Sequence, residues 1–116
     1  MIVGVGIDIV DIARLADCLR RAPRLVERLF TPAEAHLGVE SLAGRFAAKE
    51  ALAKALGAPG DLAWRDVEVV RAAGGRPRLE VSGSVARRCT ELRIVHLHVS
   101  LSHDAAVATA IVIAEG

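Results

Sequence analysis

The chain has 116 residues, 53% of them apolar and only 3% aromatic, and its formal net charge at pH 7 is +1. This length predicts a single domain over residues 1–116, and the near-neutral charge excludes a global field that would attract nucleic acid or an anionic membrane surface. The two cysteines lack the spacing of a metal site or a disulfide framework. No stretch is long enough to span a membrane, and the N-terminus has no basic signal-peptide region. We therefore expect a cytoplasmic protein.

The first predicted element is a strand over Ile2–Val10, in which apolar and small residues alternate. One face would carry Val3, Val5, Ile7 and Ile9, and the other would carry Gly4, Gly6 and Asp8. A glycine face allows another element to pack directly on the strand backbone, and the alanine-rich helix further along the chain is the natural candidate. An aspartate at a strand end is ordinarily a turn residue or a helix cap. Asp11 is the better cap, which leaves Asp8 available for another role.

Two arginine-rich helices are predicted next, from Asp11 to about Arg21 and, after a break at Pro23, over Arg24–Leu29. Together they carry five arginines and no lysine: Arg14, Arg20, Arg21, Arg24 and Arg28. Such a series is commonly a solvated surface. The alternative is a docking strip for an acidic partner, because a guanidinium group binds carboxylates and phosphates with two hydrogen bonds.

A brief helix and a long helix follow in the predicted order. Thr31–Glu34 has the sequence of a capping box with proline at the first helical position, and the helix it opens is predicted to end near Gly38. The long core helix is predicted to run from Ser41 or Leu42 to Leu56. Gly57 would supply a left-handed stop there, and the proline two residues later would prevent continuation.

The spacing of the charged residues on the core helix bears on whether the helix could bind an anion. Arg45 and Lys49 are one turn apart and share a face that suits binding of an anion, whereas Glu50 is rotated by about 100° and falls in line with Lys54. A cationic strip beside one carboxylate is what a phosphate ester with a bound divalent metal would need. On this helix alone the simpler interpretation prevails, in which Glu50 pairs with Lys54 at the surface and the other two are solvated.

The rest of the chain is predicted to contain a hairpin, a helix and two further strands. Their ranges are a strand centred on Val67–Val70, a turn over Ala73–Pro77, a return strand over Arg78–Val81, a helix from Ser82 or Ser84 to about Leu92, and strands over His96–Ser102 and Val107–Ala114. His96 and His98 share a strand face but lack a third ligand nearby, which disfavours a zinc site. Ser102 and His103 show no nucleophile elbow, so they suit contact with a phosphate or a sugar better than nucleophilic chemistry.

Three stretches taken together resemble the holo-acyl-carrier-protein synthase family, the small 4′-phosphopantetheinyl transferases. They are Gly4–Val10 with Arg14 further on, Ala43–Gly57, and Val99–His103 followed by Val107–Ile113. Gly75–Pro77 also looks like the family's hairpin turn. Each stretch alone is a weak signal, whereas all three in this order and at these separations are specific and cover almost the whole chain.

The resemblance implies an α+β fold of the 4′-phosphopantetheinyl transferase type, with a small antiparallel sheet packed against a long core helix. It implies that the chain transfers the 4′-phosphopantetheine arm of coenzyme A to a serine of an apo acyl carrier protein and releases 3′,5′-ADP, for fatty-acid or polyketide biosynthesis. It also implies a homotrimer with its sites between subunits, to which the unpaired apolar strand face would contribute.

The resemblance assigns the metal site to Asp8 and Glu50. These residues match the family carboxylates that hold Mg²⁺ against the pyrophosphate, and Mg²⁺ favours a few protein oxygens completed by waters and phosphate oxygens. The carrier serine would lose its proton to a metal-held water or to Glu50, and we favour the water because a metal-bound carboxylate is a poor base.

The remaining implied roles concern coenzyme A. Arg45 and Lys49 would hold its phosphates. Ser102 and His103 would contact the nucleotide, with His103 also able to assist proton transfer. Arg76 and Pro77 would border the adenine.

The stretch Asp11–Arg28 matches the family's carrier-docking helix, and the residues assigned to the acidic carrier are Arg14, Arg21, Arg24 and Arg28. Two departures from the family pattern are visible. The segment from Thr31 to Leu42 is short, and Asp104 follows His103 where a hydroxyl residue is more usual, so that it could either orient His103 or repel a phosphate.

A competing hypothesis is a module that binds a coenzyme-A-like ligand, an acidic protein or RNA without turnover. The pair of Asp8 and Glu50 separates the two hypotheses, because a site that only binds anions gains nothing from two carboxylates beside them.

Overall fold

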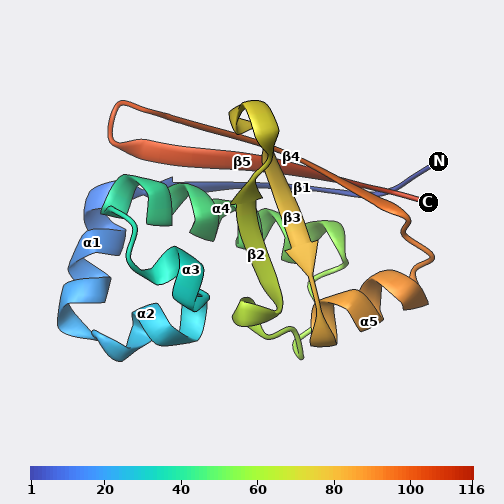
Figure 1. Ribbon diagram of the computed structural model, residues 1–116, viewed down its shortest axis with the longest axis horizontal. Coiled ribbons are helices and arrows are strands. Elements are labelled where there is room, and N and C mark those ends of the chain that lie inside the picture. The colour runs from blue at the N-terminus through green and yellow to red at the C-terminus, as the bar shows by residue number, and fades with distance from the viewer.

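A three-stranded antiparallel sheet and the long helix α4 form the centre of the molecule, and the computed structural model describes all 116 residues. The sheet has the strand order β1-β5-β4, and a separate antiparallel hairpin is formed by β2 and β3 (Figure 1). The elements are β1 (Ile2–Asp11), α1 (Ile12–Arg21), α2 (Arg24–Leu29), α3 (Pro32–Ala35), α4 (Val39–Ala55), η1 (Trp64–Asp66), β2 (Val67–Arg71), η2 (Ala73–Gly75), β3 (Pro77–Val81), α5 (Gly83–Glu91), β4 (His96–Asp104) and β5 (Val107–Glu115). The predicted α+β architecture is therefore confirmed.

The close contact between β1 and α4 depends on two glycines, as the sequence predicts. A Cβ atom on Gly4 would overlap the backbone carbonyl of Ala55, and one on Gly6 would overlap that of Ala51. No larger residue could stand at either position without moving the helix away from the strand. The side chains between α4 and β5 are also small: Ala47, Ala48, Ala51, Ala108, Ala110 and Ala114 are all 2% exposed or less.

Helix α4 begins at Val39, two to three residues before the predicted start at Ser41 or Leu42. Gly38 occupies the N-cap position with an extended backbone, and its carbonyl accepts the Leu42 N–H at 3.0 Å, so the first turn forms without a side-chain cap. The helix ends as predicted, since Gly57 adopts a φ of +85°.

The helices α1, α2 and α3 cover the N-terminal half of α4. Asp11 caps α1 by accepting the Arg14 N–H at 2.9 Å, and α2 has the predicted bounds. The predicted capping box is present, because Glu34 Oε1 accepts the Thr31 N–H at 3.0 Å. This segment buries a second, smaller apolar cluster, which includes Leu29, Phe30 and Leu42.

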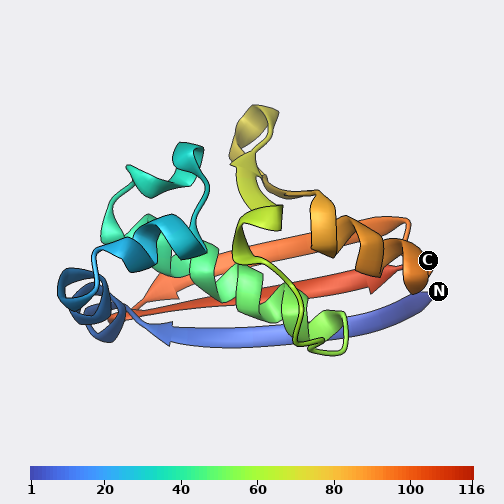
Figure 2. The same ribbon diagram turned by 90° about the horizontal axis from the view of Figure 1, so that it is seen from below.

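Only one face of the three-stranded sheet is covered by a helix, namely by α4 (Figure 2). The other face of β1 exposes a row of branched apolar side chains, namely Val3, Val5, Ile7 and Ile9, and Ile111 of β5 continues it. Ile9 is 67% exposed, which is unusual for isoleucine. None of the helices is both long enough and apolar enough to cross a membrane.

Candidate active site

Asp8 and Glu50 line one hollow, although 41 residues separate them along the chain. Asp8 follows the glycine face of β1, and Glu50 projects from α4, which those glycines hold close to the strand. The hollow has a volume of about 290 Å³, and Arg14, Cys18 and Phe46 also line it. The pKa of Glu50 is raised, first by burial and then by the negative charge of Asp8. We call this site the acidic hollow.

Lys54 belongs to the same group of residues, and its partner differs from the one expected. The simplest sequence interpretation pairs Lys54 with Glu50, but its ammonium lies 3.1 Å from Asp8 Oδ1 and donates to the Ile7 carbonyl at 2.9 Å. The close packing of β1 on α4 explains the difference, because it offers Lys54 two strand acceptors at once. The sequence aligns Lys54 with Glu50 on one face of the helix, but it does not show that Asp8 of the neighbouring strand is the partner of the lysine.

The donor atoms of the acidic hollow fit a hard divalent cation. Asp8 and Glu50 both line it, and the third lining carboxylate, Asp11, is already used as the cap of α1, where it accepts the Arg14 N–H. No group of three or more histidine, cysteine or acidic side chains that could hold a metal occurs anywhere in the structure. An all-oxygen set with only two protein ligands suits Mg²⁺, which keeps several waters and binds substrate phosphates. Burial is the larger cause of the raised pKa of Glu50 and the charge of Asp8 is the smaller one, and a divalent cation between the two carboxylates would offset their repulsion.

Lys49 does not line a phosphate site, which corrects the interpretation drawn from its spacing to Arg45. Its side chain is 0% exposed, and its ammonium donates to Glu34 Oε1 at 2.7 Å, to the Leu29 carbonyl at 2.7 Å and to the Trp64 carbonyl at 3.0 Å. Burial lowers the pKa of Lys49, and the adjacent Glu34 opposes that shift. All three protons are used within the protein, so none remains for a ligand.

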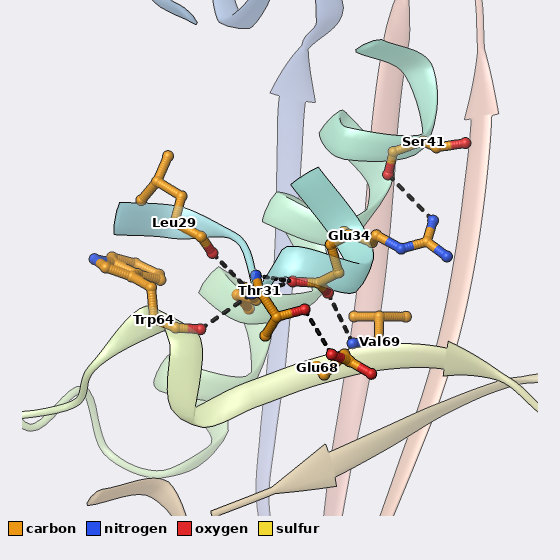
Figure 3. A network of polar contacts seen from close by, with 9 residues as sticks. Leu29, Thr31, Glu34, Ser41, Trp64, Glu68 and Val69 are labelled. Atoms are coloured by element: carbon orange, nitrogen blue, oxygen red, sulfur yellow. Dashed lines mark hydrogen bonds and ion pairs between the residues drawn. The ribbon is translucent and has the colours of Figure 1, made fainter. Parts of the chain in front are cut away.

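Glu34 is the centre of this buried network (Figure 3). Besides Lys49, it accepts the Thr31 N–H at 3.0 Å and the Val69 N–H at 2.9 Å, and the Thr31 hydroxyl donates to Glu68 at 2.6 Å. The network joins α2, α3, η1 and β2 to α4. The sequence indicated only the local capping box, because the partner of a buried lysine depends on segments distant in the chain.

Arg45 lies in a second, smaller hollow of about 140 Å³. Arg71, Ser102 and His103 line it as well, together with Ser41, Gly44, Leu101 and Glu40. Arg45 is 8% exposed, its Nε has no hydrogen-bond partner, and its only hydrogen bond is a long one of 3.5 Å to a backbone carbonyl. Burial lowers its pKa, and a second guanidinium, that of Arg71, adds to this shift. A buried cation with an unused donor beside other basic and hydroxyl groups suits an anion. We call this site the basic hollow.

The sequence prediction omitted Arg71. It is the last residue of β2, and its guanidinium donates to the Gly75 carbonyl at 2.7 Å. An exposed arginine at a strand end carries no functional signal in a single sequence. Its place opposite Arg45 depends on how the hairpin folds over α4 and β4.

The other predicted residues lie elsewhere on the surface. Arg76 and Pro77 border a third hollow with the strand β4, and that hollow has no residue other than Leu101 in common with the basic hollow. Arg14 borders the acidic hollow, whereas Arg21, Arg24 and Arg28 are exposed along α1 and α2. A single chain therefore brings Asp8 and Glu50 together, and Arg45 with Ser102 and His103, but it keeps the two groups in separate hollows.

The chain is similar over its whole length to known proteins of one family. A profile of the 4′-phosphopantetheinyl transferase superfamily matches residues 4–111. The chain is 58% identical to a holo-[acyl-carrier-protein] synthase of Streptomyces griseus, with all of both chains covered. It is 55% identical to the corresponding synthase of Clavibacter sepedonicus, with 100% of this chain and 98% of the relative covered.

Solved structures show the same arrangement of elements. The holo-[acyl-carrier-protein] synthase of Neisseria meningitidis superposes with a TM-score of 0.91 at 32% identity, and all of both chains is covered. The synthase of Helicobacter pylori, solved in complex with coenzyme A, superposes with a TM-score of 0.85 at 33% identity, covering 96% of this chain and 99% of that one.

Proposed function

This chain belongs to the 4′-phosphopantetheinyl transferase superfamily, and we propose that its acidic hollow is where it transfers the phosphopantetheine arm. It is a holo-[acyl-carrier-protein] synthase, so coenzyme A and an apo acyl carrier protein are its substrates, and holo carrier protein and 3′,5′-ADP are its products. The observation that supports this location is the convergence of Asp8 and Glu50 beside Arg14. In the proposal the 116 residues act as one catalytic domain in the cytoplasm.

The chemistry at the acidic hollow is a phosphoryl transfer. The carrier serine oxygen forms a bond to the phosphorus that bears the pantetheine arm, and the bond from that phosphorus to the bridging oxygen breaks, so the electron pair leaves with 3′,5′-ADP. Mg²⁺, held by Asp8 and Glu50, would neutralise charge on the diphosphate. The serine proton would pass to a metal-held water or to Glu50, and we favour the water because a metal-bound carboxylate is a poor base. Lys54 adds a positive charge beside Asp8.

The basic hollow supports binding of a coenzyme A phosphate. Arg45 offers an unused buried donor, and Ser102 and His103 add further hydrogen-bonding groups. The proposal assigns the adenine to the neighbourhood of Arg76 and Pro77, as the family resemblance implies. Lys49 is omitted from this set because Glu34 and two backbone carbonyls already occupy its protons.

Two features support a homotrimer with sites between subunits. The acidic and basic hollows lie apart in one chain, so a coenzyme A molecule that uses both would need two neighbouring copies. The uncovered face of β1 also exposes an apolar row that association would bury. The carrier would approach the acidic hollow across α1 and α2, where Arg21, Arg24 and Arg28 can meet its acidic groups.

The deciding experiment is mass spectrometry of an apo carrier protein incubated with coenzyme A, Mg²⁺ and this chain. We expect the carrier to gain one phosphopantetheine, and we expect Asp8→Asn to abolish the gain. A carrier that stays unmodified while coenzyme A binds would favour the competing hypothesis of a binding module without turnover.

A further inference from the structure

The basic hollow contains an arginine to which the proposed function gives no role. Arg71 lines this hollow together with Arg45, and its only hydrogen bond is the one that its guanidinium donates to the Gly75 carbonyl at 2.7 Å. A guanidinium has five N–H donors, so most of those of Arg71 are unused. Glu40 also lines the hollow, but neither arginine forms an ion pair with it or with any other carboxylate.

The two arginines of the hollow act on each other. Burial is the largest cause that lowers the pKa of Arg45, Glu34 opposes this shift, and the charge of Arg71 lowers the pKa further. Arg45 is more than nine-tenths buried, and its Nε has no hydrogen-bond partner. An anion between the two guanidinium groups would offset their repulsion and accept hydrogen bonds from their unused donors.

The alternation of side chains along β2 brings Arg71 to the hollow. Val67 and Val69 are each 3% exposed in the core, and Arg71 is the next residue on the same face of the strand. Glu68 is on the opposite face. The place of the Arg71 guanidinium therefore depends on how β2 lies against the rest of the molecule.

Two hydrogen bonds attach β2 to the segment around α3 (Figure 3). The Thr31 hydroxyl donates to Glu68 Oε1 at 2.6 Å, and the Val69 N–H donates to Glu34 Oε2 at 2.9 Å. Glu68 lies three residues before Arg71 and lines neither the acidic hollow nor the basic hollow. Any effect of Glu68 on coenzyme A must therefore pass through the position of β2 or through its charge.

We propose that Arg71 binds a coenzyme A phosphate together with Arg45, and that Glu68 is a positioning residue, which holds Arg71 at the hollow through its hydrogen bond to Thr31. The inference rests on the proposed function, since that function places a coenzyme A phosphate in the basic hollow. Arg71 donates hydrogen bonds to the phosphate, whereas Glu68 contacts only Thr31.

The role of Arg71 can be measured without turnover. The full-length protein is titrated with coenzyme A in the presence of Mg²⁺ and in the absence of carrier protein, by isothermal titration calorimetry. Arg71→Ala should weaken the affinity by about tenfold or more, because it removes charge-assisted hydrogen bonds. Arg87→Ala, which removes an exposed arginine from α5, is the matched control and should bind as wild type does. An unchanged affinity in Arg71→Ala would overturn the proposal.

Two substitutions of Glu68 separate its hydrogen bond from its charge. Glu68→Ala removes both and should weaken coenzyme A binding by about three- to tenfold, with kcat unchanged at saturating coenzyme A. Glu68→Gln keeps an oxygen that can accept the Thr31 hydroxyl, so it should restore the wild-type affinity. Glu91→Ala on α5 is the matched control. If Glu68→Gln binds as weakly as Glu68→Ala does, the charge is what matters and the positioning role is wrong.

A double-variant cycle shows whether Glu68 acts through Arg71. In a chain that already carries Arg71→Ala, Glu68→Ala should cause no further loss of affinity, because the group that it positions is absent. Losses that add in the double variant would contradict the proposal, since a general weakening of the fold predicts that result. Should Glu68→Ala fail to fold, Arg71→Ala and Glu68→Gln still decide the two parts of the proposal.

The outcomes also distinguish this inference from the proposed function. If Arg71→Ala binds coenzyme A as wild type does and transfer to the carrier continues, the inference fails and the proposed function stands. If the wild-type chain binds coenzyme A but modifies no carrier, the proposed function fails. The titrations then still decide whether Arg71 and Glu68 contribute to binding.

Discussion

The Lys54 ammonium lies 3.1 Å from Oδ1 of Asp8, the carboxylate that lines the acidic hollow with Glu50. The lysine therefore occupies one side of a carboxylate that a metal would also contact. We expect Lys54→Met to raise the affinity for Mg²⁺, because the competing cation is removed while both oxygen ligands remain. Isothermal titration calorimetry with Mg²⁺ measures this affinity. An unchanged or weaker affinity would show that Lys54 does not compete with the metal for Asp8.

Glu50→Gln should abolish transfer and yet stabilise the metal-free protein. Burial and Asp8 raise the pKa of Glu50, so its ionised form is less favourable in the folded chain than in the unfolded chain. That cost appears as pH rises through the unfolded pKa, about 4.3, and reaches its full size above the folded pKa. The melting temperature of Glu50→Gln should exceed that of wild type at pH 7, and the difference should vanish well below pH 4. A variant less stable than wild type at pH 7 would contradict the assignment of Glu50 as an unfavourably buried charge.

Reversing Arg24 and Arg28 to glutamate should raise KM for the carrier protein. Both side chains are exposed on α2, and two reversed charges at a docking surface should cost about 1–2 kcal/mol, or roughly 5- to 30-fold in affinity. KM for coenzyme A should not change, and the effect should diminish at high salt. Arg87→Glu on α5 is the matched control. Arg14 is a poorer choice for this test, because it also borders the acidic hollow.

Removing one partner of the buried pair Lys49–Glu34 should be strongly destabilising. Lys49→Met leaves the Glu34 carboxylate buried, and Glu34→Gln leaves the Lys49 ammonium without a counter-charge, so each should lower the free energy of unfolding by about 3–5 kcal/mol. Chemical denaturation of both single variants and of the double variant gives the coupling energy. Single-variant losses that simply add in the double variant would show that the two charges do not interact.

The two cysteines should react differently with iodoacetamide. Cys18 is exposed and lines the acidic hollow, whereas Cys89 is buried and burial raises the pKa of its thiol. Alkylation at pH 7.5 should modify Cys18 only, and coenzyme A with Mg²⁺ should slow this reaction. Cys18→Ser is the control and should leave a protein that the reagent does not modify. Equal labelling with and without coenzyme A would place the substrate away from the acidic hollow.

Local patterns in the sequence were sufficient for much of the fold. The alternation of glycine and branched residues in β1 predicted which face meets α4, and the Thr31 capping box and the stop at Gly57 have the predicted geometry. Each of these features depends either on residues that are close together in the chain or on the regular alternation of side chains along a strand.

The site was less predictable, because its contacts join distant segments. The spacing of Arg45 and Lys49 on one helix suggested a shared anion, but α2 and η1 enclose Lys49, while Arg45 remains beside the basic hollow. Arg71 reaches that hollow only through the position of the hairpin. Neither helix periodicity nor charge spacing contains this information.

The absence of side chains at Gly4 and Gly6 has a consequence for the evolution of the enzyme. With backbone resting on backbone, the strand and helix have no intervening side chains that could adjust, so the main chain determines how far apart the Cα atoms of Asp8 and Glu50 lie. Variation in the surrounding apolar core can accumulate without altering that separation. A single methyl group at Gly6, by contrast, would displace an entire structural layer.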